Sequence, residues 1–90
     1  MPDTTTGVLM EVAMRIRELR LDCGYSSKQM AEQTNVSLEQ YREYEKGTTD
    51  LPFTFIHKCA QVFGVEIMEL LEGSGPRLSS YSVTRRGGGQ

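Results

Sequence analysis

The sequence contains few side chains of the kinds that catalyse reactions or bind metal ions. Its histidine, His57, and its two cysteines, Cys23 and Cys59, do not have the spacing of a zinc site. A glycine-rich phosphate-binding loop, a pair of catalytic carboxylates and a Ser/His/Asp set are also missing from the sequence. We therefore predict that the protein is not an enzyme and needs no cofactor or metal. We interpret the histidine and the cysteines as inert side chains, buried or partly buried.

A second group of polar side chains follows Ser37 at helical spacing. A helix that advances about 100° per residue from Leu38 carries Tyr41 and Tyr44 on one side. The other side carries the residues that could meet a partner: Leu38, Glu39, Arg42, Glu43 and Lys46. In a helix-turn-helix, such an exposed face lies in the major groove of DNA.

The elements around this face begin with two serines. Ser26 is followed three residues later by Gln29, and Ser37 by Gln40, which is the spacing of a capping box at a helix start. The two helix starts are eleven residues apart, so only a tight turn near Asn35 fits between the helices. This spacing predicts a helix-turn-helix.

Residues that favour the left-handed conformation divide positions 8–73 into five short segments; they are Gly24, Asn35, Gly47, Gly64 and Gly73. The first segment, Leu9–Asp22, has an amphipathic apolar stripe. The fourth begins between Asp50 and Thr54, with a stripe formed by Phe53, Ile56, Ala60 and Phe63. The fifth is Glu66–Glu72. The predicted fold class is all-α, with five helices and a non-helical C-terminal tail.

The two ends of the chain differ in character from this region. We expect residues 1–7 to be disordered and residues 74–90 to begin with a linker. Tyr81 and Val83 then alternate as in a strand, so the segment is either a tail or the start of a second, β-rich domain. The sequence shows neither a secretion signal nor a membrane-spanning run, which favours the cytoplasm.

The helix pattern favours DNA binding, but the net charge of the chain does not. Positions 8–73 hold seven basic and eleven acidic residues, a net charge of −4. DNA-binding domains are often basic. This charge supports a second hypothesis, a protein-interaction or dimerisation module.

The ordered set of motifs resembles the Cro/repressor family of helix-turn-helix domains, of the xenobiotic response element type. The matching pieces are Ile16-Arg17-Glu18-Leu19-Arg20, Met30-Ala31, Val36-Ser37, Tyr44-Glu45-Lys46-Gly47, Cys59-Ala60-Gln61-Val62-Phe63-Gly64-Val65 and Leu70-Leu71. The resemblance implies a compact repressor-like domain of five helices that regulates transcription by binding DNA. Its second and third helices would form the DNA-reading unit.

The resemblance also implies roles for individual residues. Bases would be read by Leu38, Glu39, Arg42 and Glu43, with Lys46 as a further DNA contact. Phosphates would be held by Ser27 and Lys28 at the start of the second helix and by Thr48 and Thr49 after the third. Arg20 and Glu45 match an ion pair between the first and third helices.

The expected partners are double-stranded DNA and a second copy of the chain, with no membrane partner. Because Glu39 and Glu43 repel phosphates, we expect weak DNA affinity from one copy. Some repressor-like domains precede a small β-barrel of the cupin type, and residues 78–89 resemble the approach to such a barrel. A third hypothesis is therefore an accessory domain of a cupin-type enzyme.

Overall fold

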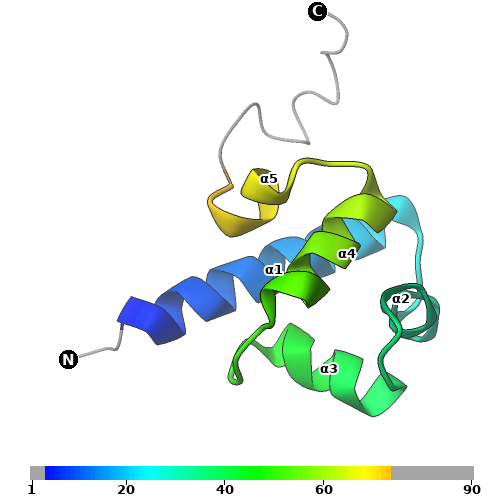
Figure 1. The fold of residues 1–90 in the computed structure, drawn as a ribbon, viewed down its shortest axis with the longest axis horizontal. Coiled ribbons are helices and arrows are strands. Elements are labelled where there is room, and N and C mark those ends of the chain that lie inside the picture. Colours follow the sequence, from blue (N-terminus) through cyan, green and yellow to red (C-terminus); the bar gives the residue numbers. More distant parts are fainter. Residues whose placement is uncertain (1–3, 74–90) are drawn as a thin grey trace, which may run out of the picture.

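The computed structural model describes residues 4–73 of the chain. These residues form five α-helices: α1 Thr4–Cys23, α2 Ser27–Thr34, α3 Leu38–Lys46, α4 Phe53–Phe63 and α5 Ile67–Leu71. Figure 1 shows α4 crossing the long α1, with α2 and α3 on one side of this crossing and α5 on the other. The all-α prediction is confirmed for this part of the chain. The linker and strand expected within 74–90 lie outside the described residues.

The first helix is longer than the sequence pattern predicts. It begins at Thr4 and ends at Cys23, whereas the predicted segment is Leu9–Asp22. Threonine and glycine are poor helix formers. Extending an existing helix nevertheless costs much less than starting one, and α1 is already fixed by core residues. The buried members of its apolar stripe are Val12, Ala13, Ile16 and Leu19.

The turn between α2 and α3 has the predicted geometry. Asn35 ends α2 in the left-handed conformation, with φ of 63°, and the N–H of Val36 donates to the carbonyl of Ala31 at 3.0 Å. Ser26 forms the complete capping box with Gln29. Ser37 makes only half of its predicted box, because its Oγ accepts from the Gln40 N–H at 3.0 Å without the return bond. The tight turn thus brings α3 directly against α2.

The buried face of α4 differs from the predicted stripe. Phe53 is exposed and Phe55 is buried, so the stripe that began at Phe53 is wrong at its first position. The ring of Phe55 packs against Tyr41, with centroids 5.9 Å apart, and against Tyr44, at 4.3 Å. Contact with the tyrosines of α3 therefore determines which phenylalanine at this end of α4 is buried.

Two contacts hold α1 to the later parts of the chain. Gly47 ends α3 with φ of +73°, and a Cβ at this position would lie 2.8 Å from the Cα of Met10. The Arg15 guanidinium donates to the last carbonyls of α5, those of Leu70 at 3.0 Å and Leu71 at 3.2 Å. These carbonyls have no partner within the helix, so the arginine satisfies them. In residues 4–73, no helix combines the length and the apolar character needed to cross a membrane.

Candidate nucleic-acid interface

The inner face of α3 is fixed by its two tyrosines. Tyr41 is fully buried at the centre of the hydrophobic core, and Tyr44 is half-buried against the same core. Both rings contact Phe55 of α4. The predicted inward direction of these tyrosines is confirmed. Because they lie on one side of α3, the opposite side of the helix must face outward.

An ion pair beneath α3 ties it to α1. Nε of Arg20 lies 2.7 Å from one carboxylate oxygen of Glu45, and Nη2 donates to the other at 3.3 Å. Both side chains are 12% exposed. The Tyr41 hydroxyl also donates to Glu45, and Nη1 of Arg20 donates to the carbonyl of Tyr25 at 3.1 Å. The pair expected between the first and third helices is therefore present, with extra hydrogen bonds.

These contacts shift the protonation of the buried groups. The hydrogen bond to Glu45 raises the pKa of Arg20. Burial, together with the bond to Glu45, raises the pKa of Tyr41 well above its ordinary value. Under the same helix, burial raises the pKa of Cys59 to about 12. On the inner side of α3, a charged arginine and a neutral tyrosine therefore both donate hydrogen bonds to the carboxylate of Glu45.

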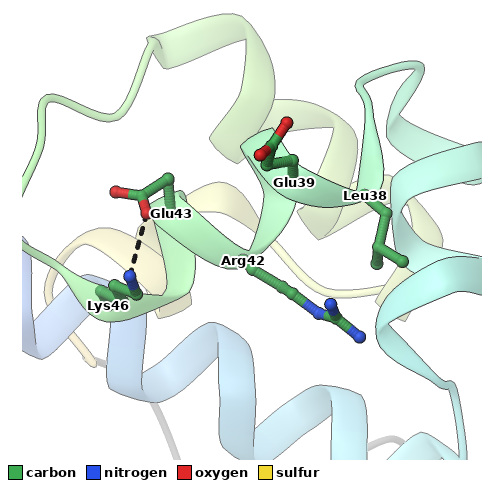
Figure 2. Close-up of a pocket in the computed structure, with 5 residues that line it drawn as sticks. All are labelled: Leu38, Glu39, Arg42, Glu43 and Lys46. Atoms are coloured by element: carbon green, nitrogen blue, oxygen red, sulfur yellow. Dashed lines mark hydrogen bonds and ion pairs between the residues drawn. The ribbon is translucent and has the colours of Figure 1, made fainter.

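The outer face of α3 is a shallow, open surface. It is lined by five residues, Leu38, Glu39, Arg42, Glu43 and Lys46. They are the residues whose helical phase predicted an outward direction, and Figure 2 shows them along one helix. The four charged residues are exposed, and Leu38 is half-buried where it packs against the core.

The charges on this surface are not equivalent. Nζ of Lys46 lies 2.9 Å from a carboxylate oxygen of Glu43, an i,i+3 pair within the helix. Arg42 and Glu39 make no ion pair within the described residues, and Figure 2 shows them pointing away from each other. The surface therefore offers one free guanidinium and one free carboxylate. Its formal charges balance, so it is not a basic patch.

The residues expected to hold phosphates lie beyond the two ends of α3. Ser27 and Lys28 open α2, with Ser27 half-buried and Lys28 exposed. Thr48 and Thr49 follow α3 in the connection to α4, with Thr48 exposed and Thr49 half-buried. In Figure 1, α2 and this connection lie at opposite ends of α3. Their hydroxyl, ammonium and backbone N–H groups are all donors, which suits anionic oxygens.

The histidine and cysteines behave only partly as expected. Cys59 is buried in the core, whereas Cys23 and His57 are exposed, so burial was wrongly expected for the last two. Cys23 ends α1, and His57 stacks on the exposed Phe53 with ring centroids 6.3 Å apart. Between positions 4 and 73, no three potential metal ligands cluster.

Comparison with known proteins agrees with this geometry. The family model described as helix-turn-helix matches residues 16–70, which run from the C-terminal part of α1 into α5. The chain belongs to this helix-turn-helix family. The matched region includes the α2–α3 unit, the turn at Asn35 and the whole outer surface of α3.

Two curated members of similar sequence regulate transcription. The chain is 30% identical over 64 residues to the HTH-type transcriptional regulator DdrOP3 of Deinococcus deserti, covering 71% of this chain and 50% of the relative. It is 33% identical over 60 residues to the cryptic phage CTXphi transcriptional repressor RstR of Vibrio cholerae, covering 67% of this chain and 54% of the repressor. The chain thus spans about half the length of these two relatives.

A solved structure shows the same fold at lower sequence similarity. The clp gene regulator ClgR from Corynebacterium glutamicum matches with a TM-score of 0.67 and 20% identity. The match covers 71% of this chain and 68% of that one. At this identity the likeness concerns the helix-turn-helix fold alone.

Proposed function

We propose that this protein is a sequence-specific DNA-binding transcriptional regulator that places α3 in the major groove. The observation that carries the proposal is the fixed outward surface of α3, built from five residues on a helix held by Tyr41 and by the Arg20–Glu45 pair. A helix of this kind fits the major groove, where its first residues reach the base edges. Membership of the helix-turn-helix family supports the same function.

Phosphate binding is assigned to the groups that flank α3. Ser27 and Lys28 stand at the N-terminus of α2, where free backbone N–H groups favour an anion. Thr48 and Thr49 offer hydroxyl groups from the connection after α3. Such contacts set the register of the protein on the duplex and leave the base contacts to α3.

The proposal includes a homodimer and an action by binding, without catalysis. One copy carries seven basic and eleven acidic residues over positions 8–73, so its long-range attraction for DNA is weak. Two copies double the number of phosphate and base contacts and read two half-sites about one helical turn apart. The proposal places this action in the cytoplasm.

The experiment measures duplex binding by fluorescence anisotropy at several salt concentrations, with the full 90-residue chain. We expect the logarithm of the binding constant to fall linearly as the logarithm of the salt concentration rises. Arg42→Ala should weaken binding by roughly tenfold or more. Arg17→Ala is the matched control, because Arg17 is an exposed arginine on α1, outside the α3 surface.

A second candidate function, a protein-interaction module, is favoured by the net charge of −4 over positions 8–73. The same assay separates the two. Equal loss of binding in Arg42→Ala and Arg17→Ala, or no binding at low salt, contradicts the DNA-binding proposal and favours this alternative.

A further inference from the structure

The four charged side chains on α3 differ in what they can still bind. Lys46 and Glu43 satisfy each other at 2.9 Å. Arg42 and Glu39 have no such partner within the described residues. Figure 2 shows their side chains leaving the helix in different directions. A ligand therefore meets five free guanidinium N–H groups from one residue and a free acceptor carboxylate from the other.

The two unpaired residues also lie nearer the N-terminus of α3 than the paired Lys46 does. Glu39 is the second residue of the helix and Arg42 the fifth, whereas Lys46 is the last. The N-terminal residues of a recognition helix are those that contact base edges. With a rise of about 1.5 Å per residue, Glu39 and Arg42 are about 4.5 Å apart along the axis. This separation is close to the spacing of neighbouring base pairs, about 3.4 Å.

The chemistry of each group selects a base. The fork of an arginine matches the two acceptors of guanine, O6 and N7. A carboxylate accepts hydrogen bonds and donates none. Cytosine presents only its N4 amino donor in the major groove, whereas adenine places the N7 acceptor beside its amino group and guanine presents two acceptors. A carboxylate therefore favours cytosine over the purines.

We infer that α3 recognises G·C pairs, with Arg42 bound to the O6 and N7 atoms of a guanine and Glu39 bound to the N4 amino group of a cytosine. The two bases belong to the same or to neighbouring base pairs. No base is assigned to Glu43 or Lys46, which form an ion pair with each other at 2.9 Å. This inference rests on the proposed function, since it requires α3 to lie in the major groove.

The test begins with selection of bound duplexes from a randomised pool by the full chain. The bound pool should be enriched in a G·C pair or in two adjacent ones. Glu39→Gln should exchange the cytosine preference for adenine, because a glutamine donates and accepts at the adenine edge. Glu18→Gln is the matched control, because Glu18 is an exposed glutamate on α1 outside the α3 surface, and it should select the same pool as the wild type. Circular dichroism checks that both variants are folded.

A second measurement isolates the arginine contact. Replacing the selected guanine by 7-deazaguanine removes the N7 acceptor and should weaken wild-type binding by roughly tenfold, within the range of a bidentate contact. The same replacement should leave Arg42→Ala binding unchanged, because that variant has already lost the contact.

Four results overturn the inference. A wild-type pool without G·C enrichment, from a chain that binds duplexes in a salt-dependent way, overturns it and leaves the proposed function intact. An unchanged preference in Glu39→Gln or an equal effect of 7-deazaguanine on the wild type and Arg42→Ala does the same. Failure of the wild type to retain any duplex at low salt overturns both.

Discussion

The two faces of α3 carry the same kinds of side chain in opposite settings. On the inner face, Glu45 is 12% exposed and bonded to Arg20 and Tyr41. On the outer face, Glu43 is 48% exposed and, among residues 4–73, pairs only with Lys46. Removing one partner of a buried pair leaves an uncompensated charge, whereas an exposed pair contributes little. The inner face of α3 therefore contributes to stability, whereas the outer face is available to bind a ligand.

The largest expected effect is the difference in stability between variants of the two glutamates. Glu45→Ala should lower the free energy of unfolding by about 3 kcal/mol, because it strands Arg20 in a nearly buried site. Glu43→Ala should change it by less than about 0.5 kcal/mol, as exposed substitutions usually do. Urea denaturation followed by circular dichroism measures both. Equal losses in the two variants would break the comparison.

The tyrosines give a matched test within the inner face. Tyr41→Phe removes the hydroxyl that donates to Glu45 and should cost about 1.5 kcal/mol, within the range for hydrogen bonds to charged groups. Tyr44→Phe should cost less, because Tyr44 is half-buried and keeps its ring contact with Phe55. The same denaturation experiment measures the loss of stability in each variant. A larger loss in Tyr44→Phe than in Tyr41→Phe contradicts the role given to the Glu45 network.

High pH should lower the stability of the domain through the buried thiol of Cys59 on α4. The pKa of Cys59 rises to about 12 from an ordinary value of 9.0 because the thiol is buried. Between these values the unfolded thiol loses its proton and the folded one keeps it, so the free energy of unfolding falls as the pH rises. Denaturation at pH 8, 9 and 10 in the presence of reductant measures the slope. Cys59→Ala should show a shallower decline than the wild type; equal slopes would exclude a contribution from this thiol.

The smallest expected difference distinguishes the two helix starts. The double variant Ser26→Ala/Gln29→Ala removes both bonds of a complete capping box and should cost about 1 kcal/mol. Ser37→Ala removes one bond at the start of α3 and should cost less. Thermal denaturation of both variants provides the comparison. A greater loss in Ser37→Ala would mean that the turn before α3 is more dependent on its cap than the hydrogen bonds indicate.

Much of the α2–α3 unit could be predicted because its signals are local. A serine cap needs only its own three following residues, and a helical phase needs only a regular advance per residue. Asn35, Tyr41 and Tyr44 therefore took their predicted places. The outward direction of all five residues on the α3 surface followed from the same phase.

The parts that could not be predicted depend on contacts between distant segments. No local sequence pattern assigns a role to Arg15. Its role depends on the end of α5 reaching α1. Phe53 and Phe55 are both apolar, and only the position of Tyr41 and Tyr44 decides that Phe55 is the buried ring. The start of α1 at Thr4 runs against the intrinsic preference of its residues. The Glu43–Lys46 pair has a local i,i+3 spacing, so attention to this signal could have found it.

The most direct test of the whole account is a titration of the ¹⁵N-labelled chain with a duplex that it selects, followed by NMR. The largest amide shift changes should fall in α3, at Ser27 and Lys28, and at Thr48 and Thr49. The outer residues of α1, such as Arg17, should change little. Shift changes centred on α1 or α5, with α3 unaffected, would contradict the assignment of the outer face of α3 as the DNA-binding surface.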